Sequence, residues 1–333
     1  MIRERPGVQG ALVGVDVGGG GVRVRVQAAQ APLGERLEER REVPIPRSRG
    51  QVDVPQLCAQ VLAQVHRLLA RLGARRVEAL ALGITGLPGL VPEPVQIARG
   101  LRAQLQVGAV VIAGDALTTH VGALAGQPGA VVAAGTGVIA LGTNHQDAWH
   151  QVDGWGLFVG DEGGGAWIGR HGLQAALRSV DGRPGGSALL ADRMRERFED
   201  PLTLVAAVHG AEAPAALLAS FAPAVAQAAR DDDGIARSIW TEAAHRLAEA
   251  GSAAADAVAT VGALPARISW GGGLFDAGDL LTGPFRDWLR KHHPTAQVLP
   301  PQGGSLDGAL LLAAGAAAGD LRSREPYLQV FPA

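Results

Sequence analysis

Two segments far apart in the chain share one pattern, in which an apolar strand runs into a glycine turn and a second strand leaves it. They are residues 11–26 (ALVGVDVGGGGVRVRV) and 129–142 (GAVVAAGTGVIALG). From residue 22 to 26 valines alternate with arginines, which is the period of a strand with one buried face. A hairpin that opens each half of the chain predicts two similar lobes with a cleft between them.

Apolar strands alternate with helical segments around these hairpins. Residues 78–84 (EALALGI) and 109–115 (AVVIAGD) predict buried strands, and residues 55–72 predict a helix. Such strands, separated by helices, predict central sheets covered on both faces, so the fold class is α/β. The remaining expected elements are a helical region at about 170–262, a strand at 266–275, an apolar helix at about 306–319 and a loosely structured tail from residue 322.

The length of the chain suits two domains. A chain of 333 residues is too long for one ordinary core and fits two domains of about 150 residues each. We expect an N-terminal lobe at 1–117 and a C-terminal lobe at 118–333, with the last helix free to pack back on the N-terminal lobe.

The composition argues against several classes of binding partner and site. The net charge of -2 argues against nucleic acid, whose ligands usually carry a basic excess. A single cysteine, Cys58, rules out an intramolecular disulfide and a Cys-based zinc site. No uncharged apolar run reaches the roughly 18–20 residues of a membrane span, and the first residues lack a signal-peptide pattern. We therefore expect a cytoplasmic protein that binds neither nucleic acid nor membrane.

Glycine clusters after strands indicate phosphate binding, because glycine lets backbone N–H groups approach an anion closely. A Walker A loop is excluded, since it needs Lys before Ser or Thr and the only lysine, Lys291, precedes His292. Residues 135–140 (GTGVIA) fit a dinucleotide fingerprint, but that fingerprint should open a helix and these residues read as a strand. The order of the clusters along the chain is the stronger signal.

That order resembles the actin/hexokinase superfamily of two-lobed ATPases, which have ribonuclease H-like domains. Residues 16–19 (DVGG) and 134–137 (AGTG) resemble its two phosphate motifs, and 270–273 (WGGG) resembles its adenosine motif. Residues 154–156 (GWG) and 160–163 (GDEG) are similar to the signature of N-acetylglucosamine kinases and their BadF/BadG/BcrA/BcrD relatives. The resemblance covers about residues 12–315 and implies a kinase that uses ATP and Mg²⁺ on a small-molecule sugar.

The resemblance also implies a role for each matching residue. Asp115 would be the catalytic base that takes the proton of the sugar 6-hydroxyl, and Asp16 would hold Mg²⁺ through water. The expected ATP-binding residues are Gly18, Gly19, Gly20, Gly21, Gly135, Thr136 and Gly137 at the phosphates, with Gly271, Gly272, Gly273 and Ala222 at the adenosine. The expected sugar-binding residues are Asp115, Gly154, Trp155, Gly156, Asp161 and Thr85, although Thr85 can also serve only to end a strand.

Some positions depart from the family pattern. Gly20 stands where a Thr or Ser hydroxyl is usual, Gly164 replaces a serine, and residues 42–53 hold no clear asparagine for an N-acetyl group. Glucosamine, N-acetylmannosamine, N-acetylmuramic acid and glucose therefore remain open as substrates. Two other functions also stay open: a sugar-binding regulator or degenerate kinase without turnover, and an activator ATPase, which the lack of paired cysteines opposes. Family resemblance favours a homodimer.

Overall fold

The computed structural model describes residues 9–18, 20–30, 36–43, 47–48, 51–87, 89, 91, 93–259 and 266–333. The chain forms two compact units, unit 1 (Met1–Gln127 and Pro301–Ala333) and unit 2 (Pro128–Pro300). The division expected at residue 117 falls inside a helix that starts at Asp115, whereas the units divide after that helix. The end of the chain returns to unit 1, because its last helix and strand complete the first core.

Unit 1 is built on a mixed sheet with the strand order β13-β7-β6-β1-β2-β3. Strand β1 runs parallel to β6, and β6 parallel to β7, while β2 pairs with β1 in the antiparallel hairpin expected from the sequence. The strands of unit 1 are β1 (Ala11–Gly18), β2 (Gly21–Ala28), β3 (Arg36–Arg41), β4 (Arg47–Ser48), β5 (Gln51–Val52), β6 (Val77–Ile84), β7 (Val107–Gly114) and β13 (Leu328–Pro332).

Strand β13 corrects the expectation of a loosely structured tail. It pairs antiparallel with β7 at the edge of the sheet, from Leu328 opposite Ala113 to Pro332 opposite Ala109. A proline at the end of an edge strand is tolerated, because no further strand needs its missing N–H group.

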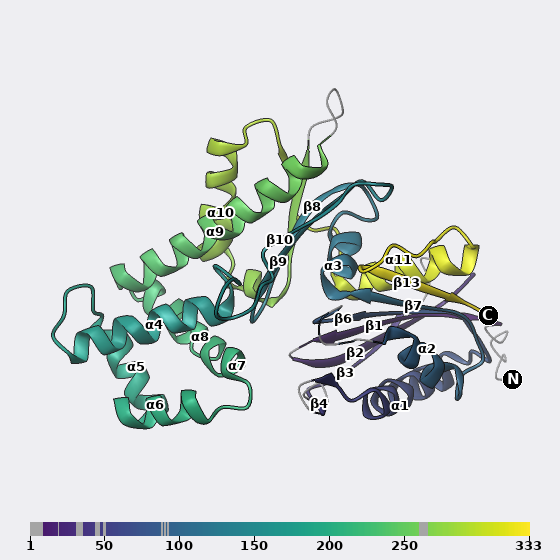
Figure 1. The fold of residues 1–333 in the computed structure, drawn as a ribbon, viewed down its shortest axis with the longest axis horizontal. Coiled ribbons are helices and arrows are strands. Elements are labelled where there is room, and N and C mark those ends of the chain that lie inside the picture. The colour runs from purple at the N-terminus through teal and green to yellow at the C-terminus, as the bar shows by residue number, and fades with distance from the viewer. Residues whose placement is uncertain are drawn as a thin grey trace, which may run out of the picture. The chain divides into compact units, whose positions relative to one another are not determined.

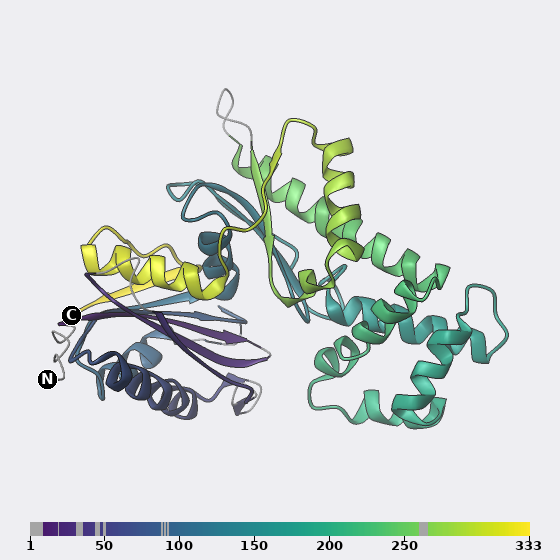
Figure 2. The same ribbon diagram turned by 180° about the vertical axis from the view of Figure 1, so that it is seen from behind.

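Helices cover both faces of this sheet. They are α1 (Val54–Leu72), α2 (Pro94–Arg102), α3 (Asp115–Ala123) and α11 (Ser305–Ala318). Figures 1 and 2 show α1 and α2 on one face and α3 and α11 on the other. Helix α1 begins where Asp53 accepts a hydrogen bond from the Gln56 N–H and ends at Gly73 in the left-handed conformation, which are the start and stop signals of an ordinary helix.

The burial of the hairpin explains its sequence. Strand β1 is buried along nearly its whole length because both of its faces are covered. In β2 the valines at 22, 24 and 26 are fully buried in the core that contains α1, whereas Arg23 and Arg25 lie on the opposite face and are only partly buried. The alternation predicted from the sequence is therefore confirmed.

Unit 2 is built on a second mixed sheet with the order β10-β9-β8-β11-β12. Its strands are β8 (Gly129–Ala134), β9 (Val138–Thr143), β10 (Trp149–Val152), β11 (Arg267–Gly271) and β12 (Gln297–Val298). Strand β9 follows the glycine turn and pairs antiparallel with β8, as a hairpin requires and a dinucleotide fingerprint does not.

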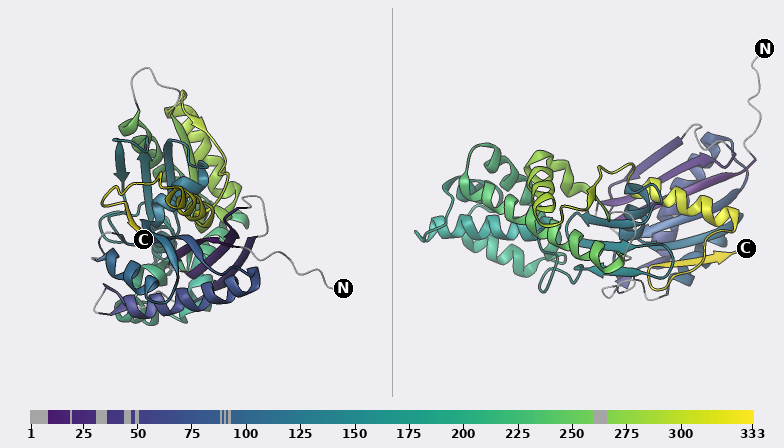
Figure 3. Two further views of the ribbon diagram at one scale, coloured as in Figure 1. Left: turned by 90° about the vertical axis from the view of Figure 1, so that its right-hand side faces the viewer. Right: turned by 90° about the horizontal axis from the view of Figure 1, so that it is seen from above.

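Most of unit 2 is helical. Its helices are α4 (Gly165–Val180), α5 (Ala188–Phe198), α6 (Pro201–Gly210), α7 (Pro214–Ala219), α8 (Ala222–Arg230), α9 (Gly234–Val258), α10 (Asp279–His292) and the short 3₁₀ helix η1 (Gly273–Ala277). The long helix α9 packs on β8, β9 and β10, and α10 lies beside it (Figures 1 and 3). None of the helices built by the described residues is long and apolar enough to cross a membrane.

Candidate functional site

In unit 1 three polar residues lie at the carboxyl ends of neighbouring parallel strands. Asp16 is near the end of β1, Thr85 follows β6, and Asp115 follows β7. These strands are adjacent in the sheet, so their ends form one edge, and open α/β sheets bind ligands at that edge. The backbone N–H of Thr85 donates to the Val17 carbonyl at 3.0 Å, which fixes Thr85 beside β1.

Asp115 is an aspartate, a residue type that often acts as a general base, and its surroundings shift its pKa. Loss of hydration raises the pKa of Asp115 above the usual aspartate value, and the negative charge of Asp16 acts in the same direction. Hydrogen bonds to Thr85 and to the Ala116 N–H, the latter at 2.8 Å, only partly oppose this rise in pKa. A partly exposed carboxylate with a raised pKa is a better proton acceptor than an ordinary surface aspartate.

Asp16 is buried and held from two sides. Arg23 lies opposite it across the β1–β2 hairpin and donates to Oδ2 through Nε at 2.9 Å and Nη2 at 2.7 Å. Ser305, the first residue of α11, donates to Oδ1 at 2.6 Å. The hydroxyl of Thr118 lies 2.7 Å from that of Ser305 and 3.0 Å from the Asp115 backbone carbonyl. Because Ser305 gives its one proton to Asp16, Thr118 donates its own proton to one of these two oxygens at a time, and the two hydroxyls link the two acidic positions.

The sequence did not indicate Ser305 or Thr118. The one available signal was the position of Ser305 directly after two glycines at the start of the last apolar helix. Nothing in that pattern relates it to Asp16, which is 289 residues away in the chain.

This group of residues fits a magnesium ion. Carboxylate and hydroxyl oxygens are the ligands that Mg²⁺ prefers, and Mg²⁺ is usually held by one or two carboxylates plus phosphates and water. In the part of the chain that the structure describes, no cluster of three or more His, Cys, Asp or Glu side chains could hold a metal without such help. The guanidinium of Arg23 on Asp16 shows that this carboxylate already attracts a cation.

The glycine turn between β1 and β2 lies at the same edge of the sheet. Gly18 ends β1, Gly20 is in the turn and Gly21 begins β2, whereas Gly19 lies outside the described residues. Gly21 has φ +115°, and a Cβ there would lie 2.0 Å from the Arg41 carbonyl oxygen, so only glycine fits. A Cβ at Gly18 would meet nothing within 4 Å, which leaves that side of the turn open.

In unit 2 the corresponding turn joins β8 to β9 and supports the start of α4. The Gly135 N–H donates to the Gly137 carbonyl at 2.9 Å, which closes the turn. The carbonyls of Gly135 and Thr136 accept from the N–H groups of Gly165 and Ala166 at 2.8 and 2.9 Å, so the turn and the N-terminus of α4 are one unit.

The loop from 153 to 162 is organised by Asp153, which the sequence analysis did not single out. Its carboxylate accepts from the backbone N–H groups of Gly154 at 2.7 Å, Asp161 at 2.8 Å and Glu162 at 2.9 Å. These bonds draw the two ends of the predicted sugar-binding segment together. An aspartate directly before Gly-Trp-Gly is a possible turn signal, but the partner eight residues later is a tertiary contact.

Asp161 connects that loop to the phosphate-type turn. Its carboxylate accepts from the backbone N–H groups of Val138 and Gly156, and a Cβ on Gly137 would lie 2.4 Å from its Oδ2. Loss of hydration raises the pKa of Asp161, and the charge of Asp153 adds to that rise, whereas the two N–H groups lower it. Trp155 is 66% exposed, so this indole is available as a flat apolar surface and is not part of a core.

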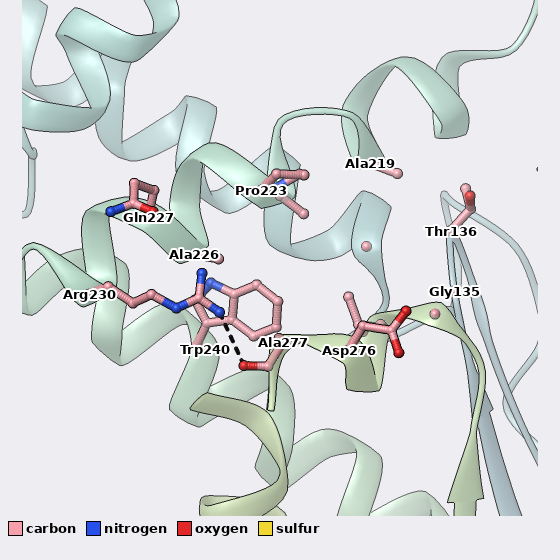
Figure 4. A pocket seen from close by; sticks show the side chains of 14 residues that line it. Gly135, Thr136, Ala219, Pro223, Ala226, Gln227, Arg230, Trp240, Asp276 and Ala277 are labelled. Carbon is pink, nitrogen blue, oxygen red and sulfur yellow. Dashed lines mark hydrogen bonds between the residues drawn. The ribbon is translucent and has the colours of Figure 1, made fainter. Parts of the chain in front are cut away.

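A pocket of about 540 Å³ lies within unit 2 (Figure 4). At one end is the Gly135–Thr136 turn, and at the other are side chains from α8 and α9, including Arg230 and Trp240. Fourteen residues line it: Gly135, Thr136, Gly165, Ala219, Ala222, Pro223, Ala226, Gln227, Arg230, Trp240, Gly273, Leu274, Asp276 and Ala277.

The pocket contains some of the residues expected at adenosine and adds others. Ala222 and Gly273 line it, whereas Gly271 and Gly272 do not. Gly272 has φ +92°, and a Cβ there would lie 2.3 Å from the Ala134 carbonyl oxygen, so it is required by the close approach of β11 to β8. Arg230 donates to the Ala277 carbonyl at 3.2 Å across the pocket wall (Figure 4).

Comparisons with known proteins agree on one group. The model of the BadF/BadG/BcrA/BcrD ATPase family matches residues 13–313. An N-acetylmuramic acid/N-acetylglucosamine kinase from Clostridium acetobutylicum is 26% identical over 214 residues, which are 64% of this chain and 70% of that protein.

Two solved structures are similar in fold. One is a provisionally assigned N-acetylglucosamine kinase from Chromobacterium violaceum, with a TM-score of 0.68, 27% identity and coverage of 92% of this chain and 99% of that one. The other is a ROK family glucokinase from Streptomyces griseus in complex with glucose and AMPPNP. At 18% identity and a TM-score of 0.55, over 91% of this chain and 99% of that one, it shows a shared fold alone.

Proposed function

We propose that this chain, which belongs to the BadF/BadG/BcrA/BcrD ATPase family, is an ATP-dependent kinase that phosphorylates the 6-hydroxyl of N-acetylglucosamine or a related amino sugar. The observation that carries the proposal is the position of Asp115, a partly exposed carboxylate with a raised pKa. It lies at the same carboxyl edge as Asp16, where the parallel strands β1, β6 and β7 end. The similarity to a kinase of N-acetylmuramic acid and N-acetylglucosamine supports the substrate class.

In the proposed reaction Asp115 acts on the sugar. Its carboxylate takes the proton of the sugar hydroxyl as that oxygen forms a bond to the γ-phosphorus, while the bond from the γ-phosphorus to the β,γ-bridging oxygen breaks and ADP leaves. Thr85 hydrogen-bonds with the same carboxylate, so it orients the base. Asp16 would hold Mg²⁺ through water, and the ion would neutralise negative charge on the phosphates.

The two glycine turns and the pocket of unit 2 form the proposed ATP-binding residues. We assign Gly18, Gly20 and Gly21 in unit 1, and Gly135, Thr136 and Gly137 in unit 2, to the phosphates, because backbone N–H groups in such turns attract anions. The pocket of unit 2 takes the adenosine, since Ala222, Pro223 and Ala226 offer an apolar wall while the Gly135–Thr136 turn lies at its other end.

The loop around Asp161 takes the sugar. The carboxylate of Asp161 already accepts from two backbone N–H groups, which leaves lone pairs for sugar hydroxyls, and exposed Trp155 offers a flat surface for one sugar face. Gly154 and Gly156 leave the backbone beside this indole free of side chains. We further propose that the protein is a cytoplasmic homodimer. Light scattering at several protein concentrations measures its oligomeric state.

The decisive experiment measures ADP and sugar phosphate from Mg-ATP with a panel of N-acetylglucosamine, N-acetylmuramic acid, N-acetylmannosamine, glucosamine and glucose. Asp115→Asn should lower kcat by about 10²–10⁴-fold, the range for loss of a general base. Asp192→Asn, on the exposed surface of α5, is the matched control and should leave kcat unchanged. Turnover that survives in Asp115→Asn contradicts the assignment of the base, and sugar binding without turnover would favour a binding-only protein.

A further inference from the structure

Both oxygens of the Asp16 carboxylate accept hydrogen bonds from the protein. Its Oδ2 accepts two N–H groups of Arg23, at 2.9 and 2.7 Å, and its Oδ1 accepts the Ser305 hydroxyl at 2.6 Å. A magnesium ion that approached Asp16 would compete for the oxygen that the guanidinium holds. The strength of metal binding therefore depends on what Arg23 does.

The two side chains that bind Asp16 differ in how tightly the surrounding packing holds them. Ser305 is buried and joined to buried Thr118, so its side chain is fixed in the packing between α11 and α3. The Arg23 side chain is 41% exposed, and Asp16 is its only ion-pair partner among the described residues. By contrast, Arg25 on the same face of β2 pairs with both Glu38 and Asp307.

The nucleotide phosphates are a second partner for the Arg23 guanidinium. It lies on β2 two residues after Gly21, the end of the turn that we assign to the phosphates. A guanidinium presents a planar set of N–H donors that matches phosphate oxygens as well as it matches a carboxylate. This chain also lacks the hydroxyl that usually ends the first phosphate motif, because Gly20 stands there.

We propose that Arg23 is a resident counter-ion of Asp16 that competes with Mg²⁺ for this carboxylate and moves to the nucleotide phosphates when the metal binds. The second half of this inference rests on the proposed function, whereas the first half does not. When no metal is bound, the Arg23 guanidinium neutralises the buried Asp16 carboxylate, which would otherwise be an unpaired buried charge. When the metal binds, the same guanidinium becomes a phosphate ligand in place of the missing hydroxyl.

The first half is tested with Mn²⁺ alone, measured by electron paramagnetic resonance on the nucleotide-free protein. Arg23→Gln should bind Mn²⁺ about threefold to fivefold more tightly than the natural chain, the fold-change that corresponds to one partly exposed ion pair. The matched control, Arg25→Gln, should leave the affinity unchanged, and Asp16→Asn should abolish the gain. Equal Mn²⁺ binding in Arg23→Gln and the natural chain, or no binding in Arg23→Gln, would overturn the inference.

The second half is tested by titrating AMPPNP in excess Mg²⁺. Arg23→Gln should weaken nucleotide binding while it strengthens Mn²⁺ binding, and Arg23→Lys should restore part of the nucleotide affinity. A merely structural role would weaken both, and unchanged nucleotide affinity would refute the move to the phosphates. Because neither titration needs a sugar or turnover, failure of the proposed kinase activity would be seen separately in the sugar panel.

Discussion

Replacing Gly308 by alanine should separate two helices that support the acidic residues of unit 1. Gly308 is on α11 where that helix crosses α3, and a Cβ there would lie 1.8 Å from the Thr118 carbonyl oxygen. Ordinary contact begins at 3.4 Å, so the helices must move apart by well over an ångström. The same movement would stretch the hydrogen bond between Thr118 and Ser305, which is now 2.7 Å.

The expected magnitude follows from opposing effects. Overpacking a tight contact costs about 1–3 kcal/mol, and the strained hydrogen bond adds about 0.5–1.5 kcal/mol. The better helix propensity of alanine returns about 0.5–1 kcal/mol. Gly315→Ala on the same helix is the matched control, because its Cβ would be 3.7 Å from the nearest atom and should only gain. The two variants should differ in unfolding free energy by about 2–4 kcal/mol, or on the order of 10 °C in Tm.

The assay must report on unit 1. All six tryptophans lie between residues 149 and 288, in unit 2, so tryptophan fluorescence does not follow the affected unit. Calorimetry and far-UV circular dichroism follow both. If Gly308→Ala melts at the same temperature as Gly315→Ala, the close crossing of α3 and α11 is wrong, and with it the physical basis for the position of Ser305.

Four further predictions concern the proposed site. Because the pKa of Asp115 is raised in the folded protein, the rate should fall on the acid side at a pH above the usual aspartate pKa, and Asp115→Asn should remove that limb of the kcat/KM profile. Because the pKa is raised, the folded state binds more protons than the unfolded state, and ionised Asp115 lowers the free energy of unfolding at neutral pH. Asp115→Asn should therefore melt at the same or a higher temperature than the natural chain at pH 7. Any gain in Tm should disappear below the usual aspartate pKa. Asp153→Ala should remove the acceptor that three backbone N–H groups share and so loosen the loop. KM for the sugar should rise by roughly tenfold, without a similar change in KM for ATP, because each such hydrogen bond contributes about 0.5–1.5 kcal/mol. Asp276 is exposed and lines the pocket between the Gly135–Thr136 turn and Arg230, where it can accept ribose hydroxyls, so Asp276→Asn should reduce the preference for ATP over 2′-deoxy-ATP; an unchanged ratio of the two KM values would exclude this role.

Local sequence patterns predicted the elements that carry the site. The two hairpins, the buried strands and the α/β class all follow from side-chain period and glycine position, which act over a few residues. The placement of Asp115 at the end of an apolar strand was also visible in the sequence, because such strands end at the same edge of a parallel sheet. The cross-strand pairing of Asp16 with Arg23 follows from the same hairpin once Gly18 pairs with Gly21.

Contacts between distant segments were not visible in the sequence. Strand β13 is short and ends in proline, so it has no strong local signal, and it forms only because β7 offers an unpaired edge. The bond from Ser305 to Asp16, the three N–H groups on Asp153 and the polar lining of the pocket each depend on how closely two packed surfaces meet. The sequence by itself determined which segments become strands, turns and helices, whereas tertiary packing decided which polar groups meet at distances short enough to hold a carboxylate in place.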